Sequence, residues 1–186
     1  MPFETGSGCS PIAAEGKAME QGKKDPQTVT ATGARAQSFN IQGVCTIALN
    51  NVLTRSGAVT ELFRTDWPEI SIEPRHMILA TMNPGAVTDW HRHTRQTDHL
   101  IAISGNIKLV LWDGRENSKT KGQHDIIRFG VLRPLIAVVP PGVWHGLRNE
   151  SGSIAQYVNV NDVPYDHADP DNFRLSSEHG KAPIDL

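Results

Sequence analysis

Short runs of alternating apolar and polar residues dominate the chain from Phe39 onward, and turn residues separate them. Alternation with a period of two is typical of strands that are buried on one face. No amphipathic helical pattern lies between the runs, so the sequence predicts an all-β, antiparallel sandwich or barrel. The candidate strands are Phe39–Ile47, Ala58–Arg64, His76–Met82, Thr88–His93, His99–Ser104, Asn106–Trp112, Asp125–Phe129, Ile136–Val139, Gly146–Asn149 and Ala155–Asn161.

The same pattern divides the 186 residues into three parts. Residues 1–38 are rich in Gly, Ser, Lys, Gln and Ala and show no periodicity, which predicts a flexible N-terminal leader. Residues 39–165 carry the alternating runs and are expected to form one barrel domain. Residues 166–186 are polar and contain proline, and we expect them to wrap the barrel as a C-terminal tail.

Composition narrows the choice of partners. A net charge of -2 argues against nucleic acid or an anionic membrane as the main partner. Two cysteines, Cys9 and Cys45, form neither a disulfide framework nor a zinc knuckle. No apolar stretch is long enough to span a bilayer, and the N-terminus has no signal-peptide core. The sequence therefore predicts a cytoplasmic protein that acts on a small molecule.

Candidate chemistry gathers in the segment WHRHTRQTDH, which runs from residue 90 to residue 99. Because side chains alternate along a strand, His91 and His93 are expected to share one face. Asp98 begins the next strand and is expected to point to the same cavity. The other face of that strand carries His99, Ile101 and Ile103. Those isoleucines predict either a homodimer partner or an additional N-terminal strand that covers them.

Two sequence motifs resemble those of the cupin superfamily. In the first, five residues separate a Gly from His-x-His, and an acidic residue and a second Gly follow. The matching residues are Gly85, His91, His93, Asp98 and Gly105, with Asp where Glu is usual, and for the second motif Pro140, Gly142, His145 and Asn149. The resemblance implies a single-domain jelly roll, the double-stranded β-helix.

A narrower resemblance, from Ile41 to Tyr165, is to the dTDP-4-dehydrorhamnose 3,5-epimerase-like (RmlC-like) cupins. It is carried by a D-x-R-x-x-S-x-T-x-G stretch over residues 113–122 and by Pro-x-Gly-x-x-His-Gly over residues 140–146. A segment with Gly57, Glu61 and Arg64 is also similar. The resemblance implies that His91 is a catalytic base and that the catalytic tyrosine is Tyr157 or Tyr165.

Departures from that family point to a metal. The Arg expected three residues before the histidine is Thr88, and the family's essential Lys aligns with Asp98, which cannot hold a developing negative charge. The set of three histidines and one carboxylate instead suits one divalent transition metal, Fe, Mn, Zn, Ni or Cu. The expected ligands are His91, His93, Asp98 and His145, with Gln96 as a substitute for Asp98.

Three functions follow from these residues. The first is a metal-dependent cupin enzyme, an oxidoreductase or isomerase that acts on a small oxygenated substrate by Lewis-acid or dioxygen chemistry. The second is a metal-independent sugar-nucleotide epimerase or isomerase with His91 as the base. The third is a cupin that binds a ligand or metal without turnover. We favour the first, with His91 and Tyr157 as catalytic residues and Gln96, His76 and Tyr157 as substrate contacts.

Overall fold

The computed structural model describes residue 24, residues 27–31, residue 36 and residues 38–175, together with residue 182 and residues 184–186. Contacts within the chain separate a first unit, residues 1–37, from a second unit, residues 38–186. Most of the predicted leader lies outside the described residues, so the division into leader, barrel and tail stays a prediction. All of the named strands belong to the second unit.

The second unit is built from β-strands, and the described residues contain no helix. An all-β jelly roll is therefore confirmed as the fold class. None of the described residues forms a helix that could span a membrane. The strands are β1 (Cys45–Ala48), β2 (Asn51–Thr54), β3 (Gly57–Thr60), β4 (His76–Met82), β5 (His91–Arg92), β6 (Asp98–Ser104), β7 (Asn106–Trp112), β8 (His124–Gly130), β9 (Leu135–Val139), β10 (Trp144–Asn149), β11 (Ala155–Asn161) and β12 (Phe173–Arg174).

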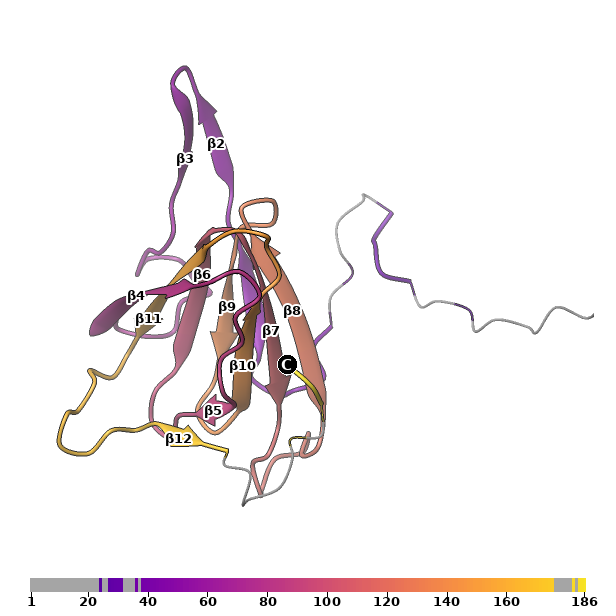
Figure 1. Ribbon diagram of the computed structural model, residues 1–186, viewed down its shortest axis with the longest axis vertical. Coiled ribbons are helices and arrows are strands. Elements are labelled where there is room, and N and C mark those ends of the chain that lie inside the picture. The colour runs from indigo at the N-terminus through magenta and orange to yellow at the C-terminus, as the bar shows by residue number, and fades with distance from the viewer. Residues whose placement is uncertain (1–23, 25–26, 32–35, 37, 176–181, 183) are drawn as a thin grey trace, which may run out of the picture. The chain divides into compact units, whose positions relative to one another are not determined.

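Two five-stranded antiparallel sheets form the barrel (Figure 1). One sheet has the order β1-β9-β6-β11-β4, and the other has the order β12-β5-β10-β7-β8. Strands β2 and β3 form a separate hairpin that extends beyond the sheets (Figure 1). Sequence neighbours often sit in different sheets, as β5 and β6 do, so a short segment can supply both walls of the interior.

A continuous core fills the space between the two sheets. It includes Leu100 from β6, Leu109 and Leu111 from β7, Ile127 from β8 and Leu147 from β10. Each is nearly inaccessible to solvent, so burial of these side chains supplies the main driving force for folding, about 1.5–3 kcal/mol for each. Leu100 and Leu147 also line the polar cavity described below.

The outer face of the first sheet is covered by the chain itself. Ile101 is only 1% exposed and packs in a second apolar cluster. That cluster includes β1 and the segment that follows the β2–β3 hairpin, through Phe63 and Trp67. The sequence predicted either a dimer partner or an additional N-terminal strand here, and in the structure an earlier part of the same chain packs in the cluster with Ile101. The homodimer itself stays a prediction. Ile103, nearer the strand end, keeps 38% of its surface exposed.

The stretch D-x-R-x-x-S-x-T-x-G forms the connection between β7 and β8. The carboxylate of Asp113 is fully buried and accepts hydrogen bonds from Arg115 Nε at 2.8 Å and from the hydroxyls of Ser118 and Thr120 at 2.6 Å. Gly122 ends the loop at a φ of +85°, a conformation that side chains disfavour. This motif therefore stabilises a long turn.

Candidate active site

The site contains two histidines from neighbouring strands. His91 on β5 is the direct register partner of His145 on β10, and paired residues on antiparallel strands project to the same face. Their ring centroids are 4.2 Å apart. His93 follows β5, with its ring 6.0 Å from that of His145. In the described chain, one ring nitrogen from each of these three histidines lies within 4.8 Å of the other two.

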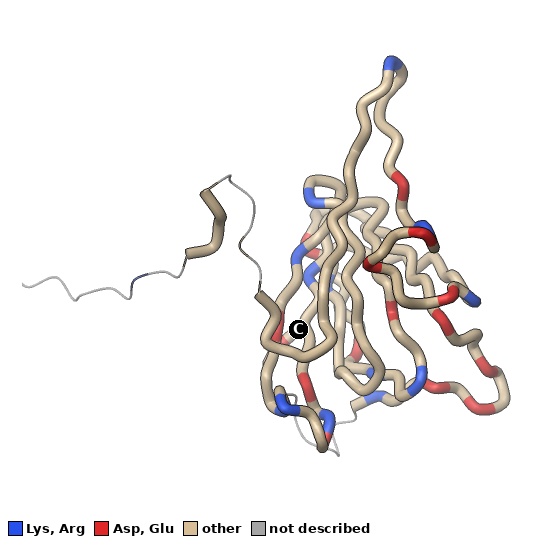
Figure 2. Tube along the Cα trace, turned by 180° about the vertical axis from the view of Figure 1, so that it is seen from behind, with Lys and Arg blue, Asp and Glu red and all other residues tan. Residues whose placement is uncertain are grey.

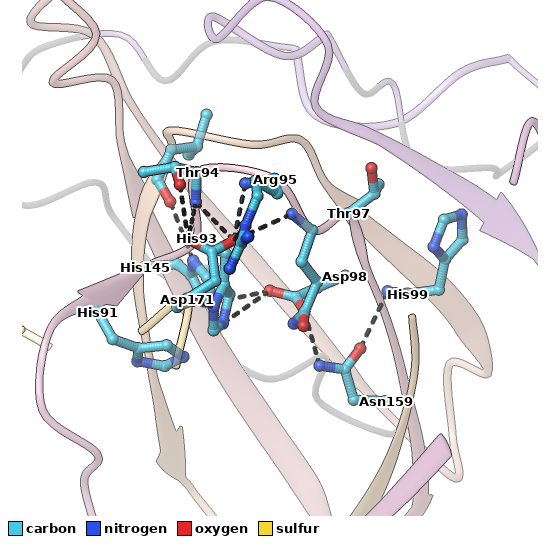
Figure 3. Close-up of polar contacts among 12 residues, drawn as sticks. His91, His93, Thr94, Arg95, Thr97, Asp98, His99, His145, Asn159 and Asp171 are labelled. Atoms are coloured by element: carbon cyan, nitrogen blue, oxygen red, sulfur yellow. Dashed lines mark hydrogen bonds and ion pairs between the residues drawn. The ribbon is translucent and has the colours of Figure 1, made fainter. Parts of the chain in front are cut away.

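Asp98 anchors the cluster from the opposite sheet (Figure 3). Its Oδ1 accepts hydrogen bonds from Gln96 Nε2 at 2.6 Å and Asn159 Nδ2 at 2.8 Å. Its Oδ2 lies 3.2 Å from His145 Nε2 and 3.7 Å from His93 Nε2. Burial acts to raise the pKa of this carboxyl, but the hydrogen bond and charge of His145 outweigh it and hold the pKa well below its usual range. Asp98 is thus a buried anion.

The position of His93 is set by the segment before β12. Its Nδ1 contacts the backbone carbonyl of Asp171, while the Asp171 carboxylate accepts N–H bonds from Thr94 at 2.9 Å and Arg95 at 2.7 Å. Burial acts to raise the pKa of Asp171, but the hydrogen bond from the Thr94 hydroxyl, at 2.6 Å, and these N–H bonds lower it to about 2. The turn after His93 is therefore tied to a segment almost 80 residues further along the chain.

The Pro-Pro-Gly turn connects the same region to His145. Gly142 has a φ of +82°, and its N–H donates to the carbonyl of His93 at 2.6 Å. An added Cβ at this glycine would lie 2.8 Å from the side chain of Arg115. Both the backbone conformation and the lack of space therefore require glycine here. Strand β10 follows this turn, and its His145 faces inward.

His91 has the properties of a neutral base. Its Nδ1 lies 3.0 Å from the carbonyl oxygen of Asp89, so this nitrogen carries the hydrogen and Nε2 is left as the acceptor. Burial lowers the pKa of His91, and the neighbouring charge of His145 adds to the effect, to about 3. An imidazole that stays uncharged at neutral pH can accept a proton from a bound molecule.

Tyr157 lines the same cavity from the facing sheet. It lies on β11, between Ala80 of β4 and Ala102 of β6. Burial, and then the charge of Asp98, raise the pKa of its hydroxyl, so the group stays protonated and can donate. The cavity has a volume of about 450 Å³ and lies between the β4-β11-β6 wall and the β5-β10 wall. This volume accommodates a small organic ligand.

The other residues predicted from the sequence take distinct places. Gln96 and His76 line the cavity, Gln96 beside Asp98 and His76 at the start of β4. Tyr165 lies at the rim and packs against His167, with ring centroids 4.9 Å apart. His99 points away from the cluster (Figure 3). Its ring lies edge-on to that of Phe63, with the ring centroids 5.8 Å apart.

Several cavity residues escaped the sequence prediction. Asn159 and Asn161 follow Tyr157 at every second position of β11 and so share its face, which the period of the strand could have indicated. The side-chain oxygen of Asn161 is buried, and among the described residues it has no hydrogen-bond partner. Asp171 and Arg174 come from the C-terminal segment, where no periodic pattern indicated a strand or a site.

The fold and cavity define a cupin barrel with a histidine-rich polar interior. Its sequence is 33% identical over 120 residues to the probable low-salt glycan biosynthesis epimerase Agl13 of Haloferax volcanii, a match that covers 64% of this chain and 77% of the relative. The structure resembles a dTDP sugar isomerase from Desulfovibrio desulfuricans G20, with a TM-score of 0.73, 25% identity and coverage of 81% of this chain and 94% of that one. No profile of a known protein family matches the sequence.

A third similarity concerns the fold alone. The dTDP-4-dehydrorhamnose 3,5-epimerase from Elizabethkingia anophelis NUHP1 superposes with a TM-score of 0.67 at 18% identity, over 80% of this chain and 84% of that one. This chain belongs to the RmlC-like cupin family of sugar epimerases. An enzymatic role is thereby supported.

Membership of this family overturns two predictions. The relatives are sugar epimerases and a sugar isomerase, so the expectation of a metal-dependent enzyme, and with it an oxidoreductase, is wrong. The predicted cofactor, one divalent transition metal, is wrong for the same reason, because the family resemblance implies proton transfer by side chains. The prediction failed because imidazoles that converge beside a carboxylate suit metal binding and proton transfer equally well. His91, His93, Asp98 and His145 do lie together, but they are not assigned as ligands.

Proposed function

We propose that this enzyme epimerises a keto sugar carried on a nucleotide, by proton transfer at a carbon next to the carbonyl. His91 acts as the base and Tyr157 as the acid. One observation carries the proposal: a neutral imidazole and a protonated phenol line one cavity from facing sheets. A keto sugar between two such groups can lose a proton from one face, and the planar enolate that forms can gain a proton on the other.

The proton balance is simple. His91 Nε2 takes the proton from the carbon, and the electron pair of the broken C–H bond moves into an enolate. Tyr157 gives its hydroxyl proton to the opposite face of that carbon, which restores the carbonyl with inverted configuration. Exchange with solvent then returns one proton to the tyrosinate and removes one from the imidazolium. General acid–base catalysis of this kind contributes roughly 10²- to 10⁴-fold to the rate.

His145 offsets the negative charge of the enolate. Its Nδ1 lies 3.1 Å from the carbonyl oxygen of Val143, and its Nε2 lies 3.2 Å from Asp98 Oδ2. Both ring nitrogens face acceptors, so Val143 and Asp98 fix the ring beside His91. In this proposal His145 takes the role that the family gives to a lysine, for which the aspartate itself is unsuited.

Substrate contacts surround these groups. Gln96, His76 and Tyr157 line the cavity and are proposed to contact the sugar. Asn161 adds a buried acceptor that has no partner among the described residues, which suits a sugar hydroxyl. A buried polar group without a partner is costly, so a ligand that donates to it gains affinity.

The first step can be tested by incubating the enzyme with a dTDP-4-keto-6-deoxy sugar in D2O and following proton NMR. The account predicts loss of the signal from the proton next to the carbonyl and growth of the signals of an epimer. A sugar isomerase shares the first step but moves the carbonyl, and the product spectrum identifies that outcome. A substrate that keeps all its carbon-bound protons would contradict both.

The same proposal includes a homodimer. Val52, Leu53 and Val59 on the β2–β3 hairpin are more than half exposed, as are Met77 and Leu79 on the edge strand β4. Exposed apolar side chains along an unpaired strand edge favour association. Light scattering at micromolar concentration is expected to give twice the mass of 20.4 kDa. A monomer mass would contradict the dimer and leave the proposed chemistry in place.

A further inference from the structure

The C-terminal segment brings an arginine to the mouth of the cavity, next to the proposed base. Strand β12 pairs with β5, and Arg174 is the direct register partner of His91. Side chains of directly opposed residues share a face and lie about 5 Å apart at Cβ. Arg174 and His91 both line the cavity, as this pairing requires.

Contacts on both sides of Arg174 fix the orientation of this short strand. The backbone N–H of Leu175 donates to the carbonyl of Trp90 at 3.0 Å. The ring of Phe173 packs under the guanidinium of Arg92 at 5.1 Å, and the same guanidinium lies 5.0 Å from the ring of Trp144. Phe173 therefore faces outward, and alternation turns Arg174 inward.

The cavity has two guanidinium groups among its described lining residues, Arg95 and Arg174. Acidic residues recur along the loop of residues 162–171 (Figure 2). Two of them form ion pairs with Arg95. Arg95 lies 3.9 Å from the carboxylates of both Asp169 and Asp171, and 3.4 Å from the carbonyl of Asp169. Its charge is thus already offset by two carboxylates.

Arg174 has one carboxylate partner among the described residues, where Arg95 has two. Its contact with Asp89 is 3.4 Å long, and the Asp89 side chain is 78% exposed. Ion pairs of this exposed kind contribute little, so a stronger anion can displace the carboxylate. A guanidinium offers five N–H donors in a planar fork that matches the oxygens of a phosphate.

We propose that Arg174 binds the diphosphate of the nucleotide sugar at the mouth of the cavity, so that the keto sugar reaches His91. This inference rests on the proposed function, which supplies the diphosphate. It assigns substrate affinity to a residue of the C-terminal strand, outside both cupin motifs. The nucleotide diphosphate alone should therefore bind, because Arg174 acts on the phosphates and not on the sugar.

The test is calorimetric titration of dTDP into the full-length protein and three variants. Arg174→Gln is expected to weaken dTDP binding by roughly 10- to 100-fold, since a charge-assisted hydrogen bond is lost. Arg174→Lys keeps the charge but lacks the planar fork of donors. Its affinity for dTDP is expected to lie between those of the wild-type protein and Arg174→Gln. Arg95→Gln is the matched control, with an expected change of less than about threefold. Because the Arg174 ion pair is exposed, each Arg174 variant should keep the wild-type thermal midpoint.

The outcomes separate the two claims. If the wild-type protein binds dTDP and Arg174→Gln binds it equally well, the Arg174 assignment is overturned while the proposed function stands. If Arg95→Gln loses as much affinity as Arg174→Gln, the assignment to Arg174 is also overturned. If the wild-type protein does not bind dTDP at millimolar concentration, the nucleotide substrate itself is wrong, and the inference is overturned with it.

Discussion

At the scale of single residues, Asp98 shows both what the sequence could predict and what it could not. Strand alternation placed its side chain in the cavity with those of His91 and His93, and the structure has the three together. The sequence could not show that His145, Gln96 and Asn159 also direct donors at this carboxylate. That arrangement makes Asp98 the hydrogen-bonded anchor of the histidine cluster.

Replacing Asp98 with Asn should therefore test the anchor. The amide keeps the shape but removes the charge that two histidines face, so we expect the free energy of unfolding to fall by roughly 2–4 kcal/mol. Urea denaturation near pH 7.5 measures it. Asp89→Asn is the control, because that carboxylate is exposed and its loss should change stability by less than about 0.5 kcal/mol. Equal stability of the two variants would refute the anchoring role.

At the scale of elements, the period of two was most reliable for the longer strands. The predicted bounds of His76–Met82, Asn106–Trp112 and Ala155–Asn161 agree with β4, β7 and β11. Strand β12 has two residues, too few to show a period, so the sequence missed it and with it Arg174. Strand β2 was missed as well, since all four of its residues are exposed and no buried face marks it.

The two glycines of the first motif offer a test of the turns between strands. Both have positive φ, +70° at Gly85 and +71° at Gly105. A Cβ at Gly85 would meet no atom within 4 Å, whereas at Gly105 it would lie 2.7 Å from Ala155 Cβ. Gly85→Ala should thus lower the free energy of unfolding by about 1–2 kcal/mol, because of the backbone conformation alone. Gly105→Ala should cost a further ~1–3 kcal/mol for overpacking, as measured by urea denaturation. Equal losses would contradict the crowding at Gly105.

At the scale of the whole molecule, family membership decides between functions that the residues alone left open. The jelly roll could be predicted because its glycine, proline and histidine positions recur at set spacings. The choice between metal chemistry and proton transfer could not, because histidines beside a carboxylate suit both, and the similarity to sugar epimerases separates them. Contacts between distant segments, such as that between His93 and Asp171, were also beyond prediction, since neither residue type nor spacing indicates them.

Acid should destabilise the whole protein through His91. The unfolded chain binds a proton at this histidine below about pH 6.5, whereas burial lowers the pKa in the folded chain to about 3. Stability is thus complete above about pH 7 and falls as the pH drops through that window. Asp98 adds a further loss of stability below about pH 4, because its pKa in the folded chain is also lowered.

Thermal midpoints measured from pH 8 to pH 4 test this prediction. The wild-type midpoint should be level above about pH 7 and fall below about pH 6.5. His91→Gln should have a shallower slope between pH 6.5 and pH 4, although not a flat one, because burial also lowers the pKa of His99. The same slope in both proteins would contradict the assignment of the pH dependence to His91.

Proton transfer from two faces is the central claim, and deuterium exchange in two variants tests it most directly. With a dTDP-4-keto-6-deoxy sugar in D2O, Tyr157→Phe should still exchange the proton next to the carbonyl, because His91 can remove it and return deuterium to the same face. Inversion in this variant should fall by roughly 10²-fold or more. His91→Asn should lose both exchange and inversion. Wild-type inversion in Tyr157→Phe, or undiminished exchange in His91→Asn, would contradict the account.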